Sequence, residues 1–211
     1  MEQSYLVIVS IGDSLTAGFQ SPSDSNPNGQ GYPYTRVLQS LMWNTVKELG
    51  LNDVNPIVEN EGNVGESTSG MLRRFDACVP RHKPDYVIIW GGLNDLSSGV
   101  GAETVVANLR NMYEKTRAIR ATPIGCTLSP VRGSAKFNEK IRAYNNKIQE
   151  LCSSENVQLI DLYDPLVDAD NWLKPEYNND GSHLNTEGYI RVGNILFNEA
   201  VKPILEKMAK S

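Results

Sequence analysis

Apolar residues along the chain follow two spacings that alternate from one end to the other. Five short runs of β-branched and other apolar residues lack polar alternation, and each predicts a strand buried on both faces. Between them, apolar residues recur at three and four positions, the spacing of a helix with one buried face. The predicted strands are residues 5–9, 54–59, 86–90, 123–128 and 157–162.

Turn and capping residues set the limits of the predicted helices. The sequence predicts five helices: one from Pro33 to Gly50, one that opens near residues 69–72, one with its apolar stripe over 105–119, one capped by Ser134 and one capped by Asn185. Pro203 lies inside the last of these and predicts a kink there, because proline cannot donate a helical hydrogen bond.

Strands that alternate with helices indicate a parallel sheet covered on both sides. The expected fold class is α/β, a three-layer α/β/α sandwich with a five-stranded parallel sheet. We expect the strand order 2-1-3-4-5, because it places the ends of the first three strands together at a switch point, where open sheets bind ligands. No linker or internal repeat divides the sequence, so residues 1–211 are expected to form one domain.

Polar, glycine-containing turns follow four of the predicted strands, at the edge where the carboxyl ends meet. Ser14 follows the first strand, Gly65 the second and Asn94 the third, and Asp180 and His183 precede the last helix. Acyl transfer needs a hydroxyl nucleophile, a base, a group that orients the base, and donors for the oxyanion. These turns offer one candidate for each requirement.

His183 is the only histidine expected on this edge, and Asp180 lies three residues ahead of it across a glycine turn. Such a turn can hold the carboxylate against one imidazole nitrogen and leave the other for Ser14. A glycine at position 65 lets its backbone N–H approach a substrate, and Asn94 can donate its amide. With the N–H of Ser14, these make three oxyanion donors.

Each of these residues also has an ordinary structural interpretation. A turn serine often caps the next helix, and aspartate, asparagine and glycine are common turn formers. His82 precedes the third strand, at the opposite end of the sheet, and is expected to be structural. The site hypothesis therefore depends on several residues converging.

A long turn-rich loop, residues 19–31, is expected to border the site, and a second loop spans residues 163–179. Aromatic rings on such loops stack on sugars or line acyl tunnels. The residues expected to contact substrate are Asp13, Tyr32 and Trp172, with Phe19, Tyr34 and Tyr177 as further candidates for the rim. Trp43, on a predicted helix, and Trp90, on a predicted strand, are expected in the core.

Composition narrows the partners and cofactors. The net charge of −5, without a basic cluster, argues against a nucleic-acid partner. With two histidines in the chain, a site built from several histidine ligands is excluded. Cys78, Cys126 and Cys152 are widely spaced, which favours buried thiols over disulfides or a zinc site. Neither a metal nor a cofactor is expected.

The first four residues include an acidic residue and no basic one, and the apolar run after them is too short for a signal peptide or a membrane span. We therefore expect a soluble, cytoplasmic chain without a membrane span, secreted only if a leader was removed. The oligomeric state stays open.

Four segments resemble the sequence blocks of the SGNH, or GDSL-type, hydrolases. They are residues 12–15 (Gly-Asp-Ser-Leu), 60–67, 92–95 (Gly-Leu-Asn-Asp) and 180–185 (Asp-Gly-Ser-His-Leu-Asn), in the order and approximate spacing of that family. The resemblance implies a flavodoxin-like sandwich. It also implies a catalytic triad of Ser14, His183 and Asp180, with an oxyanion hole from Ser14, Gly65 and Asn94.

The resulting prediction is a cofactor-free serine ester hydrolase that cleaves carboxylic ester bonds of small or acyl-chain substrates through an acyl-enzyme on Ser14. A carbohydrate O-acetylesterase is the alternative within the same chemistry. A non-catalytic binding module on the same fold is the less favoured one. The acyl chain, the alcohol of the substrate, and transfer to an alcohol in place of water stay open.

Overall fold

The apolar run near the N-terminus forms a strand with a parallel neighbour on each side in the computed structural model, which describes residues 4–210. All neighbouring strands pair in parallel, in the order β2-β1-β3-β4-β5, which confirms the expected order. The strands are β1 (Ser4–Gly12), β2 (Val54–Gly62), β3 (Tyr86–Trp90), β4 (Thr122–Cys126) and β5 (Gln158–Ile160).

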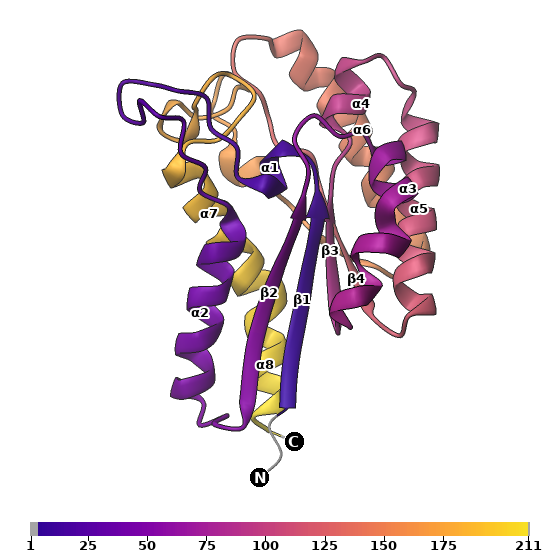
Figure 1. Ribbon diagram of the computed structural model, residues 1–211. Coiled ribbons are helices and arrows are strands. Elements are labelled where there is room, and N and C mark those ends of the chain that lie inside the picture. Colours follow the sequence, from indigo (N-terminus) through magenta and orange to yellow (C-terminus); the bar gives the residue numbers. More distant parts are fainter. Residues whose placement is uncertain (1–3, 211) are drawn as a thin grey trace.

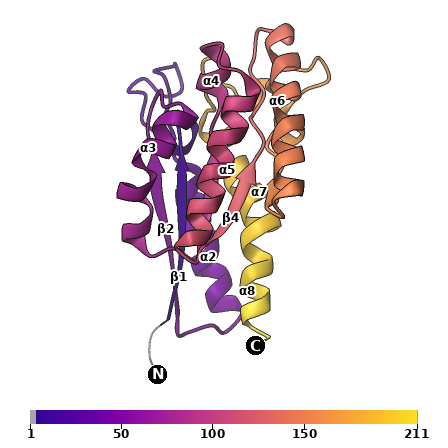
Figure 2. The same ribbon diagram turned by 90° about the vertical axis from the view of Figure 1, so that its right-hand side faces the viewer.

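Helices cover both faces of the sheet, which gives the predicted three layers (Figures 1 and 2). One face carries α3, α5 and α6, and the other carries α2, α7 and α8. The helices are α1 (Ser14–Ala17), α2 (Tyr34–Glu48), α3 (Thr68–Cys78), α4 (Leu93–Ser97), α5 (Ala102–Ala118), α6 (Ala135–Ser154), α7 (Thr186–Leu196) and α8 (Lys202–Met208). Short 3₁₀ turns cover Pro80–His82, Asp164–Leu166 and Pro175–Tyr177.

The structure differs from the predicted elements in three places. Residues 93–97, predicted as part of a turn, form the short helix α4. The strand predicted over 157–162 is limited to β5, because the chain turns away after Ile160. The last helix is interrupted by a π-helical turn, Phe197–Val201, and Pro203 lies in the first turn of α8, where its missing N–H costs nothing. The helix is therefore irregular just ahead of Pro203, the residue at which the sequence predicted a kink.

The core contains the apolar faces of the strands and helices. Trp90 is 1% exposed, and its indole N–H donates to the carbonyl of Thr127. Trp43 was expected in the core and is 40% exposed, because it lies on the outer side of α2. The three cysteines are buried free thiols, as predicted. Within residues 4–210, no helix is long and apolar enough to cross a bilayer.

Two glycines bring α1 against the carboxyl ends of β1 and β2. The register pairs Gly12 with Gly62 on β2 and with Trp90 on β3, so three strands end at one level. A Cβ atom at Gly12 would lie 2.1 Å from Thr16 Oγ1, and one at Gly62 would lie 2.1 Å from the Ala17 nitrogen. Glycine at both positions lets α1 pack directly against the carboxyl ends of β1 and β2.

Gly62→Ala is expected to lower the free energy of unfolding by about 1–3 kcal/mol, because its methyl group would displace the backbone of α1. Urea denaturation measures the change. Gly101→Ala is the matched control, since its φ of −68° suits alanine and no atom lies within 4 Å of the new Cβ. Equal losses in the two variants would contradict the close contact at α1.

Candidate active site

Ser14 occupies the first position of α1, directly after β1. Asp13 is the N-cap of this helix, and its Oδ1 accepts the N–H of Leu15 at 2.9 Å. The ordinary interpretation of Ser14 as a helix cap is therefore wrong, because its neighbour has that function. The Ser14 hydroxyl is left to face His183.

An unbroken chain of hydrogen bonds joins Ser14, His183 and Asp180. Ser14 Oγ lies 3.0 Å from His183 Nε2, and His183 Nδ1 lies 2.8 Å from Asp180 Oδ2. When Nδ1–H donates to the carboxylate, Nε2 has a free lone pair and accepts the serine proton. The structure thus brings Ser14 to the turn that carries Asp180 and His183, which lies far from it in the sequence.

The Asp180 carboxylate is surrounded by donors. Its Oδ1 accepts the backbone N–H groups of Ser182 at 3.1 Å and His183 at 2.8 Å. Its Oδ2 accepts the hydroxyl of Ser21 at 2.6 Å in addition to His183 Nδ1. Partial burial opposes ionisation, but the hydrogen bonds from Ser21, from the backbone N–H and Nδ1 of His183 and from the Ser182 N–H outweigh it and hold the pKa of Asp180 well below its usual range.

Ser21 belongs to the 19–31 loop and was not among the predicted site residues. Its backbone is bound by the Asn179 side chain, which accepts from Ser21 N at 2.6 Å and donates to Ser21 O at 3.1 Å. Phe19, in the same loop, meets the His183 ring edge-on at a centroid distance of 4.7 Å. A serine within a stretch of turn formers carries no sequence signal for such contacts.

Gly65 and Asn94, the other predicted oxyanion donors, lie on connected segments. Gly65 has a φ of 75°, and nothing lies within 4 Å of where its Cβ would be, so backbone conformation requires the glycine there. The amide of Asn94, on α4, donates to the carbonyl of Glu66 at 3.0 Å and lies 3.5 Å from Asp13 Oδ2. Arg74 on α3 binds the Glu66 carboxylate through Nε at 2.7 and 2.9 Å. The turn that carries Gly65 is therefore fixed from two sides.

Asp13 is 2% exposed, and its carboxyl faces Leu15 N and Asn94. Burial is the main cause that raises the pKa of Asp13 to about 7, and the nearby Asp95 and Glu66 carboxylates add to it, whereas the N–H of Leu15 lowers it. Its contact with substrate stays a prediction.

The predicted rim residues have different environments. Tyr34 is 0% exposed and its hydroxyl lies 3.2 Å from Thr16 Oγ1, so its prediction as a rim residue was wrong. Tyr32 is half-buried, with the Arg36 guanidinium 5.4 Å from its ring centroid. Trp172 is half-buried under Arg132, at 5.3 Å, and Tyr177 under Lys174, at 5.9 Å.

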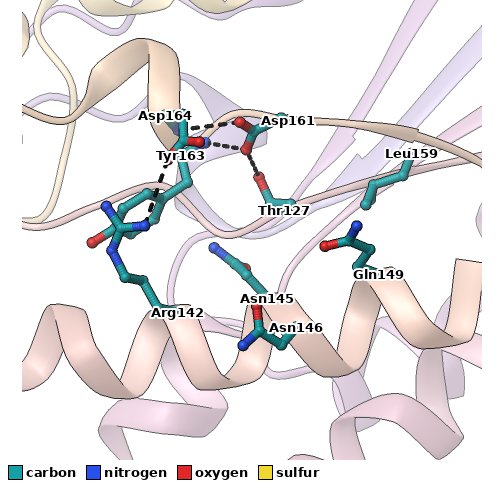
Figure 3. A pocket seen from close by; sticks show the side chains of 9 residues that line it. All are labelled: Thr127, Arg142, Asn145, Asn146, Gln149, Leu159, Asp161, Tyr163 and Asp164. Atoms are coloured by element: carbon teal, nitrogen blue, oxygen red, sulfur yellow. Dashed lines mark hydrogen bonds and ion pairs between the residues drawn. The ribbon is translucent and has the colours of Figure 1, made fainter.

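A separate pocket of about 470 Å³ lies after the ends of β4 and β5 and contains none of the predicted site residues (Figure 3). Asp161 accepts the hydroxyl of Thr127 at 2.8 Å and the N–H of Tyr163 at 2.9 Å. Arg142 on α6 stacks on the ring of Tyr163 at 4.4 Å and pairs with Asp164 at 3.6 Å. These side chains bond to one another and hold the segment that follows β5 in place.

His82 lies apart from the triad, as predicted. Its Nε2 is 2.7 Å from Glu61 Oε1, next to Arg81, which binds the same oxygen at 2.6 Å. Across the described part of the chain, no cluster of three or more histidine, cysteine, aspartate or glutamate side chains is arranged to hold a metal ion.

A sequence model of the GDSL-like Lipase/Acylhydrolase family matches residues 10–191. The chain belongs to this family. The membership confirms the predicted class of protein, a hydrolase of carboxylic esters. The matched region contains all four segments on which the resemblance was based, and it includes Ser14, Gly65, Asn94, Asp180 and His183.

Named relatives of this GDSL-family chain are distant in sequence. It is 24% identical over 194 residues to an arylesterase of Vibrio mimicus, covering 91% of this chain and 86% of that protein. It is 26% identical over 153 residues to the GDSL esterase/lipase WDL1 of Oryza sativa subsp. japonica, covering 60% of this chain and 58% of that protein. The chain thus spans less than two thirds of the rice protein.

The fold of the GDSL-family chain is shared with solved structures. A catalytic mutant of Axe2, an acetylxylan esterase from Geobacillus stearothermophilus, superposes with a TM-score of 0.73 at 21% identity, over 93% of this chain and 94% of that one. At this identity the similarity shows a common fold and no more.

Asp13→Asn is expected to remove a pH-dependent part of the stability. The unfolded chain releases the Asp13 proton near pH 4 and the folded chain near pH 7, so this group makes the free energy of unfolding of the parent fall between these values, by up to about 1.4 kcal/mol per pH unit. Asp180 changes the free energy of unfolding only at lower pH than this range, because its pKa in the folded chain is lowered. Urea unfolding from pH 4.5 to 8 measures the parent, Asp13→Asn and the exposed-loop control Asp24→Asn. A difference between Asp13→Asn and parent that is constant over this range would contradict the raised pKa.

Proposed function

We propose that this chain hydrolyses a small-molecule carboxylic ester through an acyl-enzyme on Ser14. The observation that carries the proposal is the chain of hydrogen bonds from Ser14 Oγ through His183 to Asp180, at 3.0 and 2.8 Å. Nucleophile, base and orienting carboxylate in this order are the arrangement that activates a serine for attack on a carbonyl.

In the first half of the reaction, Ser14 Oγ attacks the acyl carbonyl while His183 Nε2 takes the hydroxyl proton. The carbonyl oxygen becomes an oxyanion, for which we propose the N–H groups of Ser14 and Gly65 and the Asn94 amide as donors. His183 then gives its proton to the leaving alcohol, and the acyl group stays on Ser14. Asp180 stabilises the imidazolium that exists between the two proton transfers.

In the second half, water replaces the alcohol. His183 removes a proton from water, the hydroxide attacks the acyl-enzyme, and the carboxylic acid leaves as Ser14 recovers its proton. The net charge of −5 gives no electrostatic attraction for nucleic acid, which supports a small ester as the substrate.

An acetyl ester of a carbohydrate is the second candidate substrate, and one feature favours it. A hollow of about 330 Å³ borders the 19–31 loop, and most of its side chains are polar; its lining is Ser25, Asn26, Gln30, Gly31, Tyr32, Arg36 and Thr186. Polar groups around an aromatic ring suit a hydroxyl-rich sugar better than an acyl chain. The acetylxylan esterase with the same fold adds nothing on substrate, because the similarity concerns the fold.

Ser14→Ala is expected to fold normally and to lose roughly four to six orders of magnitude in turnover of p-nitrophenyl acetate, because the nucleophile is gone. A fluorophosphonate is expected to label the parent at Ser14 and to leave the variant unlabelled. Ser40→Ala, on the exposed surface of α2, is the control and is expected to keep parent turnover and labelling. Parent-like turnover by Ser14→Ala would disprove the mechanism, and a parent that neither turns over nor labels would favour the binding module.

Acyl preference separates the two candidate substrates. A series of p-nitrophenyl esters from acetyl to dodecanoyl is expected to give a steep fall in kcat/KM beyond acetyl for a carbohydrate O-acetylesterase, since each extra methylene that an acetyl-sized pocket cannot accommodate costs about 1–3 kcal/mol. A rising kcat/KM with chain length would exclude the carbohydrate candidate in favour of an acyl-chain hydrolase. Arg36→Ala tests whether the polar hollow is involved, since only a sugar ester should lose affinity.

A further inference from the structure

We propose that Ser21 is a positioning residue of the hydrolytic site, through which the 19–31 loop orients the Asp180 carboxylate and, by way of Asp180, the base His183. The inference rests on the proposed triad and adds a fourth member to it. It comes from a segment that sequence patterns indicated only as a rim of the substrate site.

Asp180 Oδ2 is the oxygen at which the 19–31 loop meets the triad. This oxygen receives both the Ser21 hydroxyl, at 2.6 Å, and His183 Nδ1, at 2.8 Å. The other oxygen is held by two backbone N–H groups of the same turn. Four donors fix the plane of the carboxylate, and Ser21 alone among them lies outside the 180–183 turn. Without it, the carboxylate would be held only by the turn that it has to orient.

Ser21 is itself held in place. The Asn179 side chain bonds both the N–H and the carbonyl of Ser21, at 2.6 and 3.1 Å. Next to it, Gln20 donates to Thr186 Oγ1 at 3.1 Å, and Tyr189 donates to the Phe19 carbonyl at 2.7 Å. The loop is therefore attached on both sides of the Asp180–His183 turn, and Figure 1 shows it beside the segment that precedes α7.

The Ser21 hydroxyl also affects the negative charge on the Asp180 carboxylate during the reaction. A hydroxyl that donates to Oδ2 draws negative charge away from the side of the carboxylate that meets the imidazole. Without it, the carboxylate attracts the imidazolium proton more strongly, so the base releases its proton at higher pH. Among the other titratable groups, Tyr189 on α7 interacts electrostatically with both Asp180 and Asp13. Arg132 contacts the turn only through its backbone N–H, which donates to the Gly181 carbonyl, while its guanidinium pairs with Asp168.

Ser21→Ala tests the proposal in the full chain, with p-nitrophenyl acetate as substrate. We expect kcat to fall about 10-fold, a small part of the roughly 10²- to 10⁴-fold that general base catalysis supplies, with KM unchanged. The pH at which kcat/KM reaches half of its plateau is expected to rise by roughly half a unit, within the spread of about one unit found for histidines in folded proteins. Ser21→Thr keeps a hydroxyl and is expected to restore both values.

Ser23→Ala is the matched control, because its hydroxyl meets only that of Ser25, at 3.3 Å, in the same loop. It is expected to keep the parent kcat and pH profile. The pH at which kcat/KM reaches half of its plateau does not depend on how much of the protein is active. The pH profile of Ser21→Ala therefore tests the proposal even if part of the variant is unfolded. A parent-like pH profile in Ser21→Ala, or equal effects in Ser23→Ala, would overturn the proposal.

Asn179→Ala gives a second, independent test, because it leaves the Ser21 hydroxyl present but frees its backbone. We expect a smaller change in the same direction, and a double variant no worse than Ser21→Ala alone, since the two residues act through one contact. Additive losses would show that Asn179 does not act through Ser21. If Ser14→Ala keeps parent turnover, the proposed function itself fails; if Ser14→Ala is inactive and Ser21→Ala has parent kinetics, only this inference fails.

Discussion

The 3.0 Å hydrogen bond between Ser14 Oγ and His183 Nε2 joins residues 169 positions apart, and every support of the site serves to maintain it. On one side, α1 has to lie flat on the ends of β1 and β2, which the glycines at 12 and 62 permit. On the other side, the turn that carries His183 has to meet α1 from the end of the sheet. A shift of either support by 1 Å would break the contact, because hydrogen bonds weaken steeply with distance and angle.

The surroundings of Ser14 combine two carboxyl groups with opposite electrostatic character. Asp180 lies among four donors and keeps its charge, which the imidazolium needs as a counter-charge. Asp13, one residue before the nucleophile, is buried with few donors and near two other carboxylates, so its proton is held more tightly. Neighbouring positions in the site thus favour opposite protonation states of the same functional group.

The sequence predicted the fold, and it predicted which residues meet in the hydrogen-bonded chain of the candidate site, because both depend on strong local signals. Apolar runs fixed the five strands, and the turns after them held the polar residues of the site. Elements without periodic apolar residues were missed or misplaced: α4 is too short for a helical stripe, and the π-helical turn depends on packing around Phe197. The predicted locations of Tyr34, at the rim, and Trp43, in the core, were wrong. The burial of each side chain depends on which face of α2 meets the sheet. Ser21 and Asn179 had no signal, since their roles exist only once two distant loops meet.

The long separation of Ser14 and His183 along the chain has a consequence for synthesis. At about 5–20 residues per second, His183 is added roughly 10–30 s after Ser14. Through that interval the serine has neither the base nor the carboxylate that we propose for it, and the 19–31 loop lacks Asn179 and Thr186 as anchors. A nascent chain therefore carries an unreactive hydroxyl. On the proposed mechanism, hydrolysis becomes possible only once the 180–183 turn has met α1, so activity reports that these two distant parts of the chain have come together.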